Sequence, residues 1–149
     1  MGTDASPRGY GGTLGGQCIA GRFPRTWSGL SIEALECYPV LALVGTFASS
    51  LQNKEVILEC DNLPLVHCLN KLSSKNQQVM RLMRPLVLLL LEHNITLKAV
   101  HLSSKDNWLC DTLSRQQVTG DWLVRHGKAP LTAIPQGLRP ESLGIGSTH

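Results

Sequence analysis

Four acidic residues lie where predicted strands and helices meet. Asp4 follows a short first strand, and Glu36 lies about one turn into the first predicted helix. Asp61 follows a strongly apolar strand, and Asp111 lies in the first half of the last predicted helix. Because ligands of an α/β sheet bind where strand ends and adjoining helix turns converge, we expect these four carboxylates to lie together. Such a group requires cations, and hard oxygen ligands select Mg²⁺ or Mn²⁺.

Each of these acids also has a structural explanation when it is taken alone. Asp4 could start a turn, Glu36 could be solvated, and Asp61 could only cap a helix. Asp111 could pair with Arg115 one helical turn later. For a single residue the structural explanation is the better one. The joint occurrence of all four acids, in this order along the chain, favours the metal site.

The elements that must position these acids alternate along the chain. Period-two and apolar stretches predict strands at residues 10–14, 18–23, 55–60 and 96–101, in addition to the short strand before Asp4. Helical spacing predicts helices at residues 31–51, 65–72, 77–92 and 106–117. This order predicts an α/β domain with a mixed central sheet flanked by helices.

Three local features complicate this prediction. Pro39 implies a kink or a later start of the first long helix, and Pro85 implies an interruption or a bend in residues 77–92. Only Met1, Gly2 and Thr3 precede Asp4, so the first strand is truncated relative to the five or six residues that are usual. We therefore expect the isolated chain to be marginally stable and Asp4 to be imprecisely placed.

The chain is expected to divide near residue 117. From residue 118 onward glycine and proline become frequent and helical periodicity is lost, apart from a short helical piece at 121–125. The prediction is one α/β domain over residues 1–117, followed by a tail or linker toward a following domain at 118–149.

Charge and cysteine content exclude several classes of protein. The 14 Lys and Arg exceed the 11 Asp and Glu by three, and if four acids occupy one metal site the surplus elsewhere is seven. A basic surface around an acidic site suits a nucleic-acid partner, although the charge taken alone is better explained by a slightly basic soluble domain. Five cysteines without a C-x-x-C pair argue against a disulfide framework or a zinc ribbon. No signal peptide or membrane-spanning run is visible, so a cytoplasmic or nuclear chain is expected.

The acidic motifs resemble those of ribonuclease H domains. Thr3-Asp4-Ala5-Ser6 with the following Gly9-Tyr10-Gly11-Gly12 is similar to the family's opening motif, Leu35-Glu36 to its helix-borne glutamate motif, and Cys60-Asp61-Asn62 to its third acidic motif. The stretch from His101 to Arg115, which contains Asp111, resembles the fourth motif of retroelements, especially the DIRS-type group that encodes a tyrosine recombinase. The resemblance covers nearly the whole chain, and the set of four motifs is specific.

The resemblance implies a role for each of these residues. Asp4, Glu36, Asp61 and Asp111 would be catalytic residues that bind two Mg²⁺ or Mn²⁺ ions. His101 falls where cellular relatives have a mobile histidine that helps the product leave, although it could equally be a histidine that ends a strand. Ser31 and Lys75 are the candidate substrate-binding residues. Lys75 is the only charge in a short connection where cellular relatives often have a basic protrusion, so the substrate is expected to be held largely by an adjoining reverse transcriptase domain.

The function that the resemblance implies is hydrolysis of the RNA strand of RNA–DNA hybrids during retroelement reverse transcription. One alternative is a non-catalytic, nucleic-acid-binding remnant or connecting domain of the polyprotein, which the truncated first strand favours. Another is a DNA-cutting transposase or integrase on the same fold. The sequence around Asn107 and Asp111-Thr112-Leu113-Ser114-Arg115 favours ribonuclease H over this last alternative.

Overall fold

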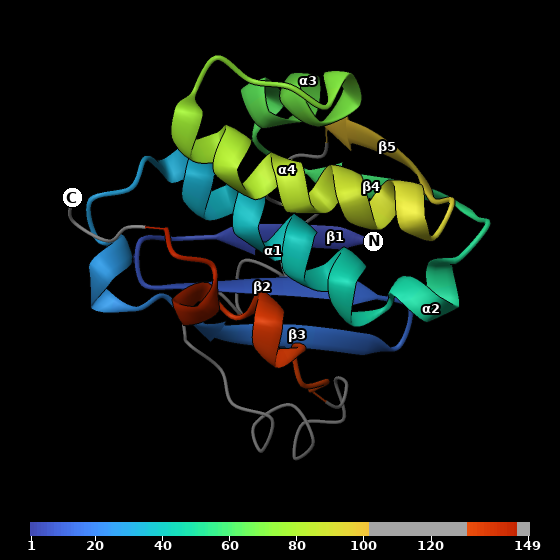
Figure 1. The fold of residues 1–149 in the computed structure, drawn as a ribbon, viewed down its shortest axis with the longest axis horizontal. Helices are drawn as coiled ribbons and strands as arrows, with labels where there is room; N and C mark the ends of the chain where they lie inside the picture. The colour runs from blue at the N-terminus through green and yellow to red at the C-terminus, as the bar shows by residue number, and fades with distance from the viewer. Residues whose placement is uncertain (102–130, 146–149) are drawn as a thin grey trace.

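The computed structural model describes residues 1–101 and 131–145 of the chain. Residues 1–101 contain five strands and four α-helices (Figure 1). The strands are β1 (Gly2–Ala5), β2 (Gly9–Leu14), β3 (Gln17–Arg22), β4 (Glu55–Cys60) and β5 (Thr96–His101). The helices are α1 (Ile32–Thr46), α2 (Ala48–Leu51), α3 (Leu63–Lys71) and α4 (Gln77–Glu92). The short 3-10 helix η1 (Arg25–Trp27) precedes α1.

The strands form one mixed sheet in the order β3-β2-β1-β4-β5. The hairpins that join β1, β2 and β3 are antiparallel, whereas β4 lies parallel to both β1 and β5. The predicted α/β class with a mixed sheet is therefore confirmed. β1 is short, as predicted, and its register with β4 contains the single pair Gly2 and Glu59. It spans four residues from Gly2 to Ala5, so Asp4 lies within the strand and the prediction that Asp4 follows it is wrong. The expected marginal stability stays a prediction.

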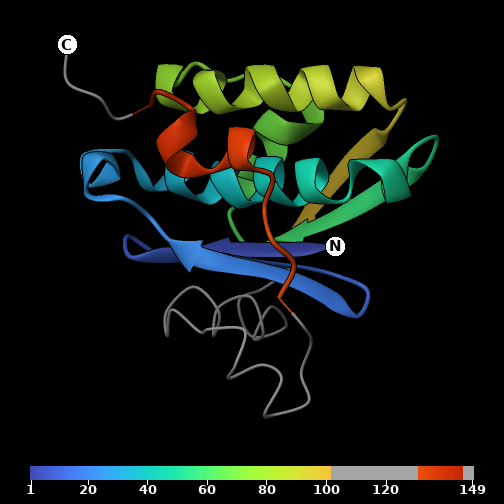
Figure 2. The ribbon, with the colours of Figure 1, turned by 60° about the horizontal axis from the view of Figure 1, so that its bottom comes forward.

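Helix α1 is the centre of the core. Every residue from Ala34 to Val44 except Glu36 is buried, which is the pattern of a helix covered on all sides. The helix packs on β1 and β2 with one face and on α4 with another, and Figure 2 shows it between the sheet and α4. The described helices lie on one face of the sheet in this view. The only residue of this stretch that reaches solvent is therefore an acid, Glu36.

Both prolines lie inside helices. α1 begins at Ile32, ahead of Pro39, so the predicted later start of this helix is wrong. α4 runs without a break through Pro85, so the predicted interruption is wrong as well. Each helix buries an apolar face along its length, and burial of this kind outweighs the loss of one backbone hydrogen bond at a proline.

Residues 131–145 return to the core, although their sequence predicts a tail. Leu131 forms a parallel bridge with Cys18 on β3, and Thr132 N–H donates to the Cys18 carbonyl at 2.8 Å. The Tyr38 hydroxyl on α1 donates to the Leu138 carbonyl at 2.8 Å, and Ile145 is buried. The 3-10 helices η2 (Gln136–Leu138) and η3 (Pro140–Ser142) lie in this segment. The boundary near residue 117 lies outside the described residues and stays a prediction.

The two faces of β4 differ in burial. Val56, Leu58 and Cys60 are buried, whereas Glu55, Ile57 and Glu59 are exposed, in the alternation expected of a strand.

Within the described residues, no helix has the length and apolar content needed to cross a membrane.

Candidate metal and nucleic-acid site

Three of the four predicted acids lie together. Carboxylate oxygens of Asp4, Glu36 and Asp61 are all within 4.8 Å of one another. Asp4 is buried, and Glu36 and Asp61 are half-buried. The fourth predicted acid, Asp111, lies outside the described residues. Three hard, anionic oxygen donors at this separation fit Mg²⁺ or Mn²⁺.

Each of the three acids is positioned by a different element. Asp4 lies in β1, where it is paired with Gly11 of β2. Glu36 lies on the second turn of α1, which crosses the sheet next to β1. Asp61 follows the end of β4, the parallel neighbour of β1. The site therefore forms only when α1 packs on β1 and β4 pairs with β1 in the correct register.

The surroundings of Glu36 disfavour its charge. Burial raises the pKa of Glu36 most strongly, and the carboxylates of Asp61 and Glu33 raise it further. A hydrogen bond from the Asn62 side-chain amide to Glu36 Oε2 acts in the opposite direction and lowers the pKa. The Asn62 amide therefore partly offsets the increase in the pKa of Glu36 that burial and the neighbouring carboxylates cause.

The nearby thiol of Cys60 is not a competing ligand. Burial raises the pKa of Cys60 to about 12, and the carboxylates of Glu36, Asp61 and Asp4 contribute to this increase. At neutral pH the thiol is therefore protonated. A protonated thiol is a poor ligand for a hard divalent cation, so the oxygen donors determine which ion the site selects.

His101 lies beside the acid cluster. It ends β5 and is in register with Cys60 at the end of β4. Its ring Nε2 lies 3.2 Å from the Asp61 backbone carbonyl. Because a carbonyl oxygen can only accept, Nε2 carries the hydrogen in this contact. The ring is exposed, so it can leave this position without disturbing the core.

Ser31 is the N-cap of α1 and joins this helix to the start of α4. Its Oγ accepts hydrogen bonds from Ala34 N–H at 3.2 Å and from the Asn76 side-chain amide at 3.1 Å. Its own N–H donates to Gln78 Oε1 at 2.8 Å. A cavity of about 320 Å³ adjoins this cap, lined by Thr26, Gly29, Leu30, Gln77, Gln78, Arg81 and Ile145. The cavity thus combines amide groups with the guanidinium group of Arg81.

Lys75 lies in the connection between α3 and α4. A cavity of about 280 Å³ is lined there by Lys75, Lys71 and His67 together with Cys68, Ser73 and Ser74. Lys71 is the last residue of α3 and was not singled out by the sequence analysis. Lys71 at the end of α3 and Lys75 in the loop therefore line the same cavity.

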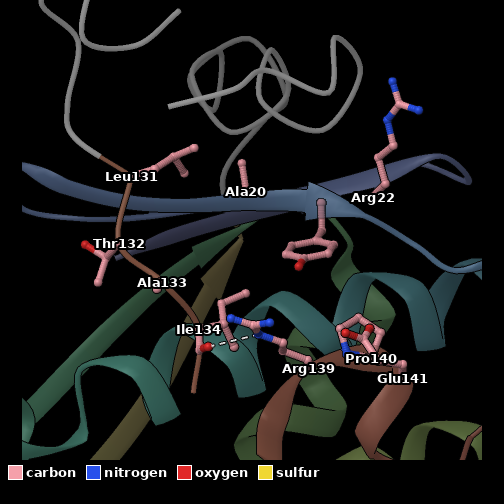
Figure 3. Close-up of a pocket in the computed structure, with 10 residues that line it drawn as sticks. Ala20, Arg22, Leu131, Thr132, Ala133, Ile134, Arg139, Pro140 and Glu141 are labelled. Atoms are coloured by element: carbon pink, nitrogen blue, oxygen red, sulfur yellow. Dashed lines mark hydrogen bonds between the residues drawn. The ribbon is translucent and has the colours of Figure 1, made fainter. Parts of the chain in front are cut away.

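Another cavity lies away from the acids. It measures about 440 Å³ and lies between β3 and residues 131–141, and none of the three clustered acids lines it. Figure 3 shows that Arg22 and Arg139 extend on opposite sides of the strand, and that Arg139 is turned toward the Ile134 carbonyl. Their guanidinium groups therefore do not converge in this cavity.

A solved structure with the same architecture is the crystal structure of RNase H1 from the halophilic archaeon Halobacterium salinarum. It is 14% identical to this chain, with a TM-score of 0.62 over 77% of this chain and 92% of that one. This chain has the ribonuclease H-like fold. No protein-family model matches the sequence, and no curated protein matches it significantly.

Two further polar residues of this region were not predicted from the sequence as site residues. From the sequence, Asn62 stands out only as part of the Cys60-Asp61-Asn62 motif, and its contact with Glu36 was missed because the two residues are 26 positions apart. Arg81 gave no signal, because an arginine on the solvent side of a helix is common. Its place beside the Ser31 cap follows from the packing of α4 against α1.

Proposed function

We propose that this chain is a metal-dependent ribonuclease H that hydrolyses the RNA strand of RNA–DNA hybrids. The observation that carries the proposal is the cluster of Asp4, Glu36 and Asp61 on a ribonuclease H-like fold. On the basis of the sequence motifs, we further propose that the chain acts in retroelement reverse transcription, next to a reverse transcriptase domain.

The acid cluster would hold two divalent ions, with Asp111 as the fourth ligand. Such ions supply an activated water and stabilise the departing 3′ oxygen of the phosphodiester. The contribution of the chain is to hold the carboxylates together before substrate arrives, so that little reorganisation is needed during the reaction. The products would be a 5′-phosphate and a 3′-hydroxyl.

Two cavities have cationic side chains that suit the backbone of a nucleic acid. One adjoins the Ser31 cap and is lined in part by Arg81, and the other is lined in part by Lys71 and Lys75. We assign Ser31 and Arg81 to one backbone phosphate and Lys75 to another, farther along the duplex. Contacts of this kind position a duplex without reading its bases, so cleavage should depend little on sequence. The 2′-hydroxyl groups of RNA then distinguish the strand that is cut.

His101 would assist the release of product. Its exposed ring is held by the Asp61 carbonyl rather than by a carboxylate of the cluster. It can therefore move toward a leaving phosphate without removing a metal ligand. This assignment requires His101 to matter for turnover and not for metal binding.

The decisive experiment is cleavage of a labelled RNA–DNA hybrid with Mg²⁺ by the wild type and by Asp61→Asn. We expect the substitution to lower kcat/KM by at least about 100-fold, because one ligand charge of a two-metal site is lost. Glu59→Gln is a matched control, since Glu59 also lies near the end of β4 but on its exposed face. It should retain activity within about twofold.

Two results would overturn the proposal. One is cleavage by the wild type in excess chelator, and the other is undiminished cleavage by Asp61→Asn. A folded wild-type protein that binds the hybrid but does not cut it with either Mg²⁺ or Mn²⁺ would instead identify the chain as a non-catalytic, nucleic-acid-binding domain.

A further inference from the structure

The three described carboxylates of the site are held by three different elements, and the chain does not connect these elements directly at the site. Asp61 precedes α3, while Glu36 projects from α1, so the separation of their carboxylates depends on how the start of α3 is held against α1. The residue at that junction is Asn62, the N-cap of α3.

The Asn62 side chain uses both of its polar ends. Its Oδ1 accepts a hydrogen bond from Leu65 N–H at 3.0 Å, which caps the first turn of α3. Its Nδ2 donates to Glu36 Oε2. The opposite orientation of the amide would place oxygen against the carboxylate and remove the cap, so these two contacts fix the orientation.

We propose that Asn62 is a positioning residue that fixes the Glu36 carboxylate relative to Asp61, so that the two ligands are set for a divalent cation. The inference rests on the proposed function, because it assigns Glu36 and Asp61 to the metal. By holding Oε2, Asn62 restricts rotation of the carboxylate and leaves Oε1 available as a ligand. Hydrogen-bond partners of this kind, one step removed from the metal, set ligand orientation and metal affinity.

An amide is well suited to this position. A lysine or arginine would neutralise Glu36 and compete with the cation, and an aspartate would add another negative charge beside the cluster. A serine could still cap the helix but could not reach Glu36, because its side chain is shorter and lacks the amide group. Asn62→Ser therefore separates the two contacts of this residue.

The test is Mn²⁺ binding to the full chain, measured by calorimetry with no nucleic acid present. We expect Asn62→Ser to weaken Mn²⁺ binding by about 10-fold or more. The matched control is Asn76→Ser. Asn76 caps α4 in the same way, but its amide group donates to the Ser31 hydroxyl and not to a carboxylate. The control should bind Mn²⁺ within about twofold of the wild type.

Thermal unfolding without metal completes the test. Both variants keep a serine cap, so their melting temperatures should agree within about 4 °C. An unchanged Mn²⁺ affinity for Asn62→Ser, an equal loss for both variants, or a much lower melting temperature for Asn62→Ser alone would overturn the proposal. Mn²⁺ binding that weakens as expected in a chain that cuts no hybrid would leave Asn62 as a positioning residue and refute the nuclease function instead.

Discussion

Helices α3 and α4 begin in the same way but in different chemical surroundings. Both have an asparagine N-cap whose Oδ1 accepts from backbone N–H groups of the first turn. The amide end of each side chain then reaches α1 or its cap. At α3 the amide of Asn62 meets the carboxylate of Glu36, whereas at α4 the amide of Asn76 meets the neutral hydroxyl of Ser31.

This difference divides the start of α1 into two regions. The region around Glu36 contains three acids and would bind cations. The region around Ser31 adjoins a cavity with Arg81, and no acid is among the described residues that line this cavity. An asparagine caps a helix in both regions. The regions differ in the group that its amide contacts, which is the carboxylate of Glu36 in one and the hydroxyl of Ser31 in the other. If the two regions are as distinct in function as in composition, substitutions in each should have different effects.

The largest effect is expected from Glu36→Gln. This change should abolish hybrid cleavage, lowering kcat/KM by at least about 100-fold, because it removes a ligand charge. The same change should raise the melting temperature of the metal-free protein at neutral pH, by about 2–4 °C for each ~1 kcal/mol of repulsion removed. Cleavage assays and thermal unfolding in chelator measure the two effects.

The sign of the stability effect follows from the raised pKa of Glu36. The folded state holds the proton at a higher pH than the unfolded state does, so the unfolding free energy of the wild type falls as pH rises through this interval. A glutamine at this position has no proton to lose, so the variant should lack this fall. Glu33→Gln is the control, because it removes a charge one turn away without removing a ligand. A lower melting temperature for Glu36→Gln would contradict the electrostatic description of this region.

A smaller effect is expected at the other region. Arg81→Ala should raise KM for the hybrid by about 5- to 10-fold, since one phosphate contact is lost, and should leave kcat nearly unchanged. The effect should shrink at higher salt, where phosphate contacts contribute less. Steady-state kinetics at two salt concentrations measure this. Arg84→Ala, on the same helix but outside the cavity lining, is the control, and an equal effect of both changes would show that the cavity is not a specific contact.

A still smaller effect is expected from His101→Ala. If His101 promotes product release, its removal should lower the steady-state rate by roughly 3- to 10-fold and leave the first turnover and Mn²⁺ affinity intact. Comparison of single-turnover and steady-state rates distinguishes these cases. A slowed first turnover would place His101 with the acids rather than with product release.

The smallest effect is expected at a third asparagine, near the other end of α3. Asn70 donates to the Ala99 carbonyl at 2.9 Å and accepts from Ala99 N–H at 2.8 Å, so it binds β5 as a neighbouring strand would. Asn70→Ala should lower the unfolding free energy by about 1 kcal/mol, measured by urea denaturation, with little effect on Mn²⁺ affinity. A large loss of Mn²⁺ affinity would show that the position of α3 is set from both ends, and not mainly by Asn62.

Local sequence determined the elements of this protein. Strands β4 and β5 have the bounds that apolar alternation predicts, and α4 spans the residues that helical spacing predicts. The positions of Asp4, Glu36 and Asp61 at strand ends and in a helix turn could also be predicted, because caps, turns and periodicity act within a few residues. These local patterns predicted that the three acids would converge, which the structure shows.

Only the tertiary structure decided how the elements are joined. The contact of Asn62 with Glu36, the cavity beside Ser31 and the return of residues 131–145 to β3 and α1 link residues far apart in the chain. The two prolines belong to the same category, since burial of α1 and α4 keeps both helices continuous through positions where local preference favours a break. In each case the deciding free energy comes from packing between distant segments, which no short stretch of sequence specifies.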